Sequence, residues 1–383
     1  MSKRILFILP NLTVGGTISS FTSIFEHIQN KYDISVYALS GDKNVEITFE
    51  SRIIPSYWML DMYFSVLNNQ RGIKYVVAFI VKFLKRICLY LHIPLEQWCY
   101  KRASKSLTKK YDIIVAFEEG PSTKFGSYLT ASKRVAWVHC DYSRMASCGH
   151  ELNLYACYDR IICVSAYTAN VFRNIYPSLD NKIDFIYNLL DYKRILERAH
   201  CEIEDTRYDT STFTILSMGR FVDVKRFEYI PYIVAQLKTM GVQLNWYVIG
   251  PIGKSDLYEK FVNNIQTYHV EKMVHYLGNK QNPYPYLRRA DLLVSLSSSE
   301  ACPMIFNEAK ILGVPVVTTN FPTAKEFIST DEGLVVPLEQ MGKAICSLYT
   351  NTEEYNNLRK RLKTKKYSSD DIYCKINNLF EGD

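Results

Sequence analysis

The stretch from Asp291 to Asn320 constrains the fold more than any other part of this sequence. It opens with an apolar run, Leu292 to Leu296, which is typical of a buried strand. The next segment has Pro303 in its first turn and Gly313 just past its end, a placement that indicates a helix. A second apolar run, 314–319, predicts another buried strand. The stretch is therefore a strand–helix–strand unit, from which parallel sheets are built.

Two carboxylates mark the junction inside this unit. Glu300 lies in the loop and Glu308 lies eight residues later in the helix, so both can face the same side. Backbone N–H groups near Met304 and Ile305 are expected to point from the helix start towards an anion. Carboxylates beside such a site more naturally accept hydrogen bonds from the hydroxyls of a ribose and of a sugar. Without its context, the pair also fits two solvated glutamates that flank a helix.

The spacing E-x7-E at this junction, followed by AKILGVPVVTT, closely resembles glycosyltransferase family 4. Members of that family are retaining nucleotide-sugar enzymes with two Rossmann-like domains, the arrangement called GT-B. The resemblance implies that Glu300 contacts the donor sugar and Glu308 the ribose. It covers nearly the whole chain and is most specific over 213–337. Ala301 and Cys302 depart from the usual Gly and aromatic residue, which bears on how the loop approaches the sugar.

Two cations precede this junction in another strand-to-helix loop. Arg220 and Lys225 lie five residues apart after the apolar run 213–217. Two cations beside a helix start can bind a diphosphate, and both residues match the family pattern G-R-x4-K. Solvated surface cations are a common alternative. The position of this loop upstream of E-x7-E favours the diphosphate site.

The N-terminal half carries further elements of the resemblance. Residues 4–9 predict the first buried strand, and Gly15 and Gly16 follow it before an amphipathic helix. A Gly pair lets backbone approach a ligand closely, although a plain tight turn fits equally well. In the family such a pair faces the donor phosphates or the acceptor. His139 ends a later strand and, with Asp141, matches the element W-x-H-x-D, whose His reaches the donor sugar near the reacting carbon.

The net charge of +7 is concentrated in one region. Residues 62–111 hold ten Lys or Arg and one acid, which leaves 36 basic and 38 acidic residues elsewhere. On a helical wheel the basic side of this region comprises Arg71, Lys74, Lys82, Lys85 and Arg86. The opposite arc comprises Val76, Ile80, Phe83, Leu84, Ile87 and Leu91. We expect a basic amphipathic helix within 71–93 that lies on an anionic membrane surface. One alternative is a helix whose apolar side packs on the N-terminal sheet. Binding of nucleic acid ranks low, because no nucleic-acid-binding motif accompanies the charge.

The chain of 383 residues, 48% hydrophobic and 22% charged, is long enough for two globular domains. We predict an α/β GT-B fold whose two Rossmann-like, parallel-sheet domains face each other across a cleft. The N-terminal, acceptor-side domain spans 1–200, the nucleotide-sugar-binding domain spans 201–365, and the tail 366–383 crosses back to the first domain. The ten Cys show no zinc-ligand spacing. No signal peptide and no apolar run of ~20 residues is evident, so we expect a cytoplasmic protein, peripheral at the inner face of the cell membrane.

These features predict a retaining glycosyltransferase of the hexosyltransferase type. It would move a sugar from a nucleotide-sugar donor, in the first place a UDP-sugar, to a glycan acceptor. A lipid-linked oligosaccharide in capsule, O-antigen or exopolysaccharide synthesis is the expected acceptor. His139 and the Gly pair would complete the donor site on domain closure. We expect no metal or other cofactor, because no D-x-D element lies in a donor loop and GT-B enzymes generally use none.

Two other functions stay open at this point. A GT-B sugar-nucleotide epimerase would need additional acid/base residues in the cleft. A non-catalytic GT-B subunit that binds a partner transferase would be expected to lose Glu300, Arg220 or Lys225, and all three are present.

Overall fold

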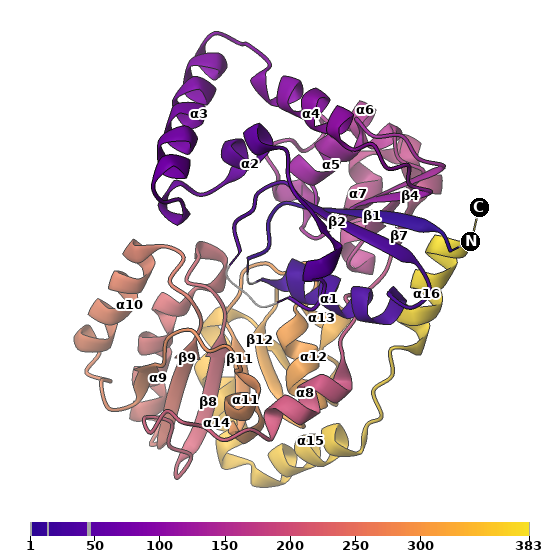
Figure 1. Cartoon of the computed structure of the whole chain (residues 1–383). Coiled ribbons are helices and arrows are strands. Elements are labelled where there is room, and N and C mark those ends of the chain that lie inside the picture. The colour runs from indigo at the N-terminus through magenta and orange to yellow at the C-terminus, as the bar shows by residue number, and fades with distance from the viewer. Residues whose placement is uncertain (1, 14, 44–46, 383) are drawn as a thin grey trace. The chain divides into compact units, whose positions relative to one another are not determined.

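The computed structural model describes residues 2–13, 15–43 and 47–382, and the chain divides into two α/β units (Figure 1). Unit 1 comprises Met1–Leu189 and Ser369–Asp383, and unit 2 comprises Leu190–Ser368. The sequence predicted boundaries between residues 200 and 201 and between residues 365 and 366. The structure divides the chain eleven residues earlier at the first boundary, after Leu189, and three residues later at the second, after Ser368. The C-terminal helix is thus part of the same unit as the N-terminal strand.

Unit 1 contains a parallel sheet with strand order β3-β2-β1-β4-β5-β6-β7. The strands are β1 (Arg4–Leu9), β2 (Asp33–Ala38), β3 (Ile53–Ile54), β4 (Ile113–Ala116), β5 (Lys133–Val138), β6 (Arg160–Cys163) and β7 (Ile183–Phe185). The helices are α1 (Gly16–Ile28), α2 (Trp58–Phe64), α3 (Ile73–Tyr90), α4 (Leu95–Ser106), α5 (Pro121–Gly126), α6 (Leu152–Ala156), α7 (Ala166–Ile175) and α16 (Asp370–Glu381).

Strand β1 shows how this sheet is covered on both faces. Leu6 and Ile8 belong to a buried cluster with residues of α2, α4 and α5. Phe7 points the other way, because side chains alternate along a strand. Its ring packs against Phe21 of α1 at 5.0 Å and Phe380 of α16 at 6.0 Å. A strand buried on both faces requires a continuous apolar run, which is the pattern that predicted it.

Unit 2 contains a second parallel sheet with strand order β10-β9-β8-β11-β12-β13. The strands are β8 (Phe213–Met218), β9 (Leu244–Ile249), β10 (Val274–Tyr276), β11 (Leu292–Ser295), β12 (Val316–Thr319) and β13 (Gly333–Val336). The helices are α8 (Tyr192–Ala199), α9 (Ile230–Thr239), α10 (Ser255–Thr267), α11 (Tyr284–Arg289), α12 (Met304–Ile311), α13 (Ala324–Phe327), α14 (Met341–Thr350) and α15 (Thr352–Thr364).

The core of unit 2 lies between this sheet and the helices α9, α10 and α14. Trp246 of β9 is fully buried, and its indole N–H donates to the Ser217 hydroxyl at 3.0 Å. That bond satisfies the one polar atom of the side chain inside an otherwise apolar cluster.

The strand–helix–strand unit predicted from the sequence is present as β11, α12 and β12. Strand β12 begins at Val316, later than the predicted 314–319, and Pro315 precedes it. Proline has no N–H to donate to a neighbouring strand, so the ladder starts after it. Helix α12 begins at Met304, and Pro303 caps it in an extended conformation.

Candidate functional site

Each sheet reverses its strand order at one place. The reversal lies between β1 and β4 in unit 1 and between β8 and β11 in unit 2. Connections that leave two such strands diverge to opposite faces, and the crevice outside their carboxyl ends is where open α/β sheets bind ligands. The residues predicted to contact the donor lie in the loops and helices that follow these or the adjacent strands.

The loop after β8 in unit 2 is fixed against the loop after β9. The Gly219 N–H donates to the Ile249 carbonyl at 2.9 Å. A Cβ on Gly250, whose φ is +149°, would lie 1.8 Å from the Gly219 carbonyl oxygen. A side chain cannot fit there, so glycine is required for this close approach. The contact fixes the backbone that leads into Arg220.

Arg220 is exposed, and the first part of its side chain passes over Gly253. A Cβ on Gly253 would lie 2.7 Å from Arg220 Cγ. The stem of the arginine therefore has a defined course, while its guanidinium can reach a ligand outside the carboxyl end of β8.

Lys225 and Glu300, which are 75 residues apart in the sequence, lie in contact. Lys225 Nζ is 2.5 Å from Glu300 Oε1, and the side chains are 19% and 18% exposed. The Ser297 hydroxyl donates to the same carboxylate oxygen at 2.7 Å, and the Thr323 hydroxyl donates to the Glu300 carbonyl at 2.6 Å. The fold thus brings one cation and one carboxylate from the predicted site to a single point between the loops after β8 and β11.

Glu308 lies near the middle of α12 in a mostly buried position. The Tyr284 hydroxyl donates to its Oε1 at 3.3 Å, and the Arg198 guanidinium lies over the Tyr284 ring at 5.3 Å. Burial raises the pKa of Glu308 to about 7, while the Tyr284 bond and the Arg198 charge act in the opposite direction. Tyr284 and Arg198 were not predicted as site residues, and no motif in the sequence marks them.

The start of α12 faces the same carboxyl end of the sheet. Pro303 is extended, with φ −73° and ψ 92°, and its carbonyl accepts the Phe306 N–H at 3.1 Å. Amides in the first turn of a helix have no acceptor within the helix. Those of Met304 and Ile305 belong to this first turn.

In unit 1, Gly15 and Gly16 follow β1 at the start of α1. Gly15 is extended (φ 174°), a conformation open to any residue, and no atom lies within 4 Å of the position of a Cβ on it. Neither the backbone conformation nor the surrounding space therefore requires a glycine at position 15.

Strand β4 lies beside β1 at the strand reversal of unit 1, and Glu118 lies in the segment just after it. Burial and the neighbouring Glu119 raise the pKa of Glu118 to about 7, and a hydrogen bond with Thr17 opposes this rise. Glu118 was not predicted as a site residue. The available signal was an acidic pair directly after a buried strand, because strand ends in such sheets face the ligand crevice.

His139 directly follows β5 and is held by its backbone. Its N–H donates to a Glu119 carboxylate oxygen at 2.7 Å, and its ring lies 4.7 Å from the Phe117 ring. Burial lowers the pKa of His139 to about 3, so the imidazole is neutral at physiological pH. Its Nε2 is buried with no hydrogen-bond partner among the described residues. Asp141 caps the following turn by accepting the Ser143 N–H at 3.1 Å.

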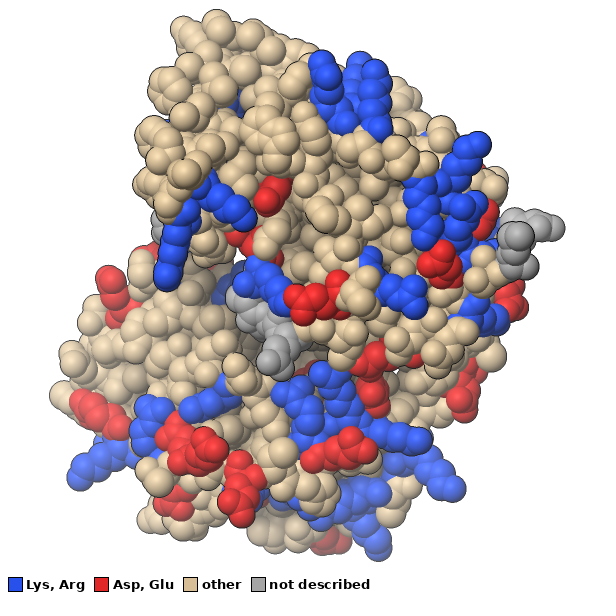
Figure 2. Space-filling model, viewed as in Figure 1, with Lys and Arg blue, Asp and Glu red and all other residues tan. Residues whose placement is uncertain are grey.

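Helix α3 carries the predicted amphipathic segment, and its apolar side faces outward. Its buried residues are Ala78 and Val81. The apolar arc is 38% to 57% exposed and comprises Val76, Ile80, Phe83, Leu84, Ile87 and Leu91. Figure 2 shows a largely uncharged surface over this helix. The alternative in which the apolar side packs on the N-terminal sheet is therefore wrong.

The basic residues of this segment are less uniformly exposed than the helical wheel predicts. The exposed ones are Arg71, Lys74 and Arg86. Lys82 is partly buried, and Lys85 turns inward, with its Nζ 4.1 Å from the centre of the Tyr63 ring. On the wheel, Lys85 lies on the same face of α3 as the buried residues Ala78 and Val81. Its side chain therefore turns towards the rest of unit 1. The charge that α3 presents to solvent is accordingly smaller than predicted.

No helix in the part of the chain that the structure describes has the length and apolarity needed to cross a membrane. No group of three or more His, Cys, Asp or Glu side chains there is arranged to hold a metal ion.

Residues 202–366 match the protein family described as glycosyl transferases group 1. A Klebsiella pneumoniae protein, described as an uncharacterised 41.2 kDa protein in the cps region, is 28% identical over 187 residues, which are 47% of this chain and 48% of that protein. A Campylobacter jejuni enzyme, N-acetylgalactosamine-N,N'-diacetylbacillosaminyl-diphospho-undecaprenol 4-alpha-N-acetylgalactosaminyltransferase, is 26% identical over 197 residues, 51% of each chain. The matched segments span about half the length of these two relatives.

A solved structure, Anabaena HepE in complex with UDP and glucose, resembles the whole chain. The likeness covers 99% of both chains with a TM-score of 0.74 at 15% identity. At this identity it shows the fold alone. Together with the two parallel sheets, it confirms the predicted α/β GT-B class.

Proposed function

We propose that this chain, whose residues 202–366 match the glycosyl transferases group 1 family, is a retaining glycosyltransferase that uses a nucleotide-sugar donor. The observation that carries the proposal is the Lys225–Glu300 pair at the carboxyl edge of unit 2, between the loops that follow β8 and β11. A cation, a carboxylate and a helix start at one sheet edge offer partners for a phosphate and for sugar hydroxyls together.

The proposed donor is a UDP-sugar, bound at the edge of the unit 2 sheet where the strands have their carboxyl ends. Arg220, Lys225 and the amides of Met304 and Ile305 would bind the diphosphate. Glu308 would accept hydrogen bonds from the ribose hydroxyls. The complex of HepE with UDP and glucose supports the choice of uridine, because that protein has the same fold.

Glu300 would accept hydrogen bonds from the transferred sugar, and the Ser297 and Lys225 contacts would hold it in place. We also propose, as the sequence suggested, that His139 and the loop of Gly15 and Gly16 contact the donor. A neutral imidazole suits this role, because it can share a hydrogen bond with a sugar hydroxyl without adding charge beside the anomeric carbon.

The chemistry would separate charge in a defined direction. The bond between the anomeric carbon and the diphosphate oxygen breaks, which leaves positive charge on the sugar and negative charge on the leaving phosphate. Arg220, Lys225 and the dipole of α12 would stabilise that phosphate. The acceptor oxygen then bonds to the same face of the sugar, and its proton passes to the leaving phosphate. We propose that no metal or other cofactor takes part.

The proposed acceptor is a lipid-linked glycan in cell-surface polysaccharide synthesis, with capsule as the first candidate. The name of the Campylobacter relative includes a diphospho-undecaprenol acceptor, and the Klebsiella relative lies in a cps region. The exposed apolar side of α3 supports a position on a membrane, since exposed aromatic and aliphatic side chains are stabilised in the interfacial layer. We therefore propose that the protein works in the cytoplasm, peripheral at the anionic inner face of the cell membrane.

A transfer assay tests this function. Release of UDP would be measured from UDP-glucose, UDP-galactose and their N-acetyl forms, with and without lipid-linked saccharide. We expect Glu300→Gln to lower release by about 100-fold or more, because it removes charge beside the sugar. Glu339→Gln, at an exposed surface position, is the matched control and should keep full activity. If no UDP-sugar is turned over, or if Glu300→Gln retains full turnover, the proposal fails.

A further inference from the structure

A pocket lies in unit 1 among the end of α3, the start of α4, helix α5 and the segment around Glu151. It encloses about 400 Å³, a volume typical of small-molecule sites. None of the residues assigned to the donor lines it. Its lining combines two kinds of side chain: ionisable and phenolic ones, called the polar wall below, and aliphatic ones, called the aliphatic wall.

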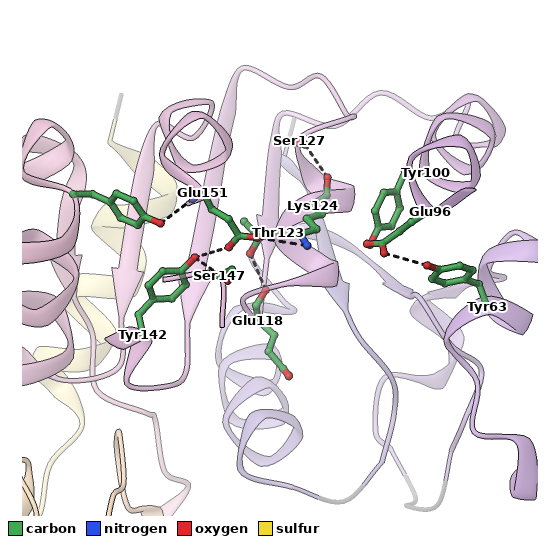
Figure 3. Close-up of polar contacts among 11 residues, drawn as sticks. Tyr63, Glu96, Tyr100, Glu118, Thr123, Lys124, Ser127, Tyr142, Ser147 and Glu151 are labelled. Carbon is green, nitrogen blue, oxygen red and sulfur yellow. Dashed lines mark hydrogen bonds and ion pairs between the residues drawn. The ribbon is translucent and has the colours of Figure 1, made fainter. Parts of the chain in front are cut away.

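The two carboxylates of the polar wall already have donors. Glu96 accepts hydrogen bonds from the hydroxyls of Tyr63 and Tyr100 at 3.2 and 2.9 Å, as Figure 3 shows. Glu151 accepts the Tyr142 hydroxyl on one oxygen and pairs with Lys124 at 3.5 Å through the other. Both carboxylates are therefore satisfied within the protein and do not require a cationic ligand.

Lys85 is the cation of this wall that remains suited to bind an anion. Its Nζ lies over the Tyr63 ring, and among the described residues it forms no ion pair. Burial lowers the pKa of Lys85, although the charge of Glu96 acts in the other direction. An ammonium that has lost part of its hydration gains from a bound anion more than an exposed one does.

The aliphatic wall joins the pocket to the exposed surface of α3. Leu89 and Ile93 line the pocket and are also 63% and 50% exposed, and Leu154 is a further aliphatic residue of the lining. An apolar chain that leaves the pocket past Leu89 and Ile93 would run onto the same apolar surface that we place on the membrane.

We propose that this pocket binds a phosphate-bearing lipid, with the phosphate at Lys85 and the chain between Leu89, Ile93 and Leu154. This inference rests on the proposed function, because that function places α3 on a membrane. Two sources share the chemistry: a phospholipid of the membrane and the lipid phosphate of a lipid-linked acceptor. In either case the pocket holds a lipid beside α3, which keeps unit 1 on the membrane that carries the acceptor.

Calorimetric titration of the full chain with water-soluble lipids tests the inference. The probes are dihexanoyl phosphatidate for a phospholipid, farnesyl diphosphate for an acceptor lipid and glycerol 3-phosphate for the phosphate without a chain. We expect both lipids to bind, and glycerol 3-phosphate to bind at least about ten-fold more weakly because it buries no chain. Tighter binding of phosphatidate would identify the membrane as the source, and tighter binding of farnesyl diphosphate would identify the acceptor.

Three variants separate the pocket from the surrounding surface. Lys85→Met removes the cation and keeps the stem, and Leu154→Trp places a larger side chain in the lining of the pocket. Each should weaken lipid binding by about ten-fold or more. Lys101→Met, on the exposed side of α4, is the matched control and should leave lipid binding unchanged.

Two outcomes would overturn the inference: unchanged lipid binding in both pocket variants, or equal binding of glycerol 3-phosphate and the lipids. Protection by UDP, measured on the same proteins, keeps the two proposals distinguishable. Lost lipid binding with UDP protection intact supports the pocket, whereas lipid binding without UDP protection of the wild type refutes only the transferase proposal.

Discussion

Replacing Glu308 by Gln is expected to stabilise the empty protein at neutral and alkaline pH while it weakens nucleotide binding. Gln keeps an oxygen that can accept the Tyr284 hydroxyl, which donates to Glu308 at 3.3 Å, but it has no charge to bury. Residues that bind ligands are often costly to the stability of the ligand-free protein. The pKa of Glu308 allows that cost to be worked out.

The cost follows from the difference between the folded and unfolded pKa values. Burial raises the pKa of Glu308 from an ordinary value of 4.5 to about 7. Below pH 4.5 the carboxyl is protonated in both states, and the destabilisation is absent. It grows between pH 4.5 and 7 as the unfolded chain loses its proton first, and above pH 7 it reaches about 3 kcal/mol. In a domain of this size, that corresponds to a change in Tm of roughly 6 °C or more.

Thermal unfolding followed by circular dichroism from pH 4.5 to 8.5 measures the effect. The Tm of Glu308→Gln should exceed that of the wild type at pH 8, and the difference should shrink towards zero near pH 4.5. Glu339→Gln, an exposed carboxylate, should show no such trend. A Glu308→Gln protein that is no more stable than the wild type at pH 8 would refute the argument that this carboxyl is buried at a cost.

Three further substitutions test other parts of the account. Gly250→Ala would place a Cβ 1.8 Å from the Gly219 carbonyl oxygen and should lower the free energy of unfolding in urea by about 3 kcal/mol or more. Gly241→Ala, which also has positive φ but open space around it, should cost only about 1 kcal/mol, and equal losses would contradict the close approach. Phe83→Ser, at a 57% exposed position, should leave the Tm within about 1 °C and reduce binding to anionic vesicles by about ten-fold; unchanged vesicle binding would remove α3 from the membrane surface. Lys225→Met should slow sugar transfer by about 100-fold or more. Full activity of this variant would show that the Lys225–Glu300 pair takes no part in catalysis.

The sequence predicts those parts of the fold that depend on neighbours along the chain. Strands buried on both faces need continuous apolar runs, so the runs 4–9, 213–217 and 292–296 correspond to β1, β8 and β11. Pro303 and Gly313 bound α12 because one lacks an N–H and the other adopts a φ of +73° after the helix. These signals are local, and tertiary contacts do not override them here.

Contacts between segments that lie far apart in the sequence could not be predicted from it in the same way. The motif gives Lys225 and Glu300 separately, but their ion pair depends on β8 and β11 being adjacent in the sheet. The partners of Glu308, Tyr284 and Arg198, come from helices that no motif marks. The helical wheel of α3 likewise shows two sides without showing which one faces solvent. Strand order and helix packing decide these points.

Protection of the chain by UDP against thermal unfolding, without added metal, tests the central claim most directly. A ligand that binds only the folded state at 100 times its Kd stabilises it by about 2.7 kcal/mol, which predicts a rise in Tm of roughly 5 °C or more. Arg220→Met should remove that rise, and Lys343→Met, at an exposed position on α14, should keep it. A Tm that no nucleotide raises, or equal protection of Arg220→Met and the wild type, would contradict a nucleotide-sugar site at the carboxyl edge of unit 2.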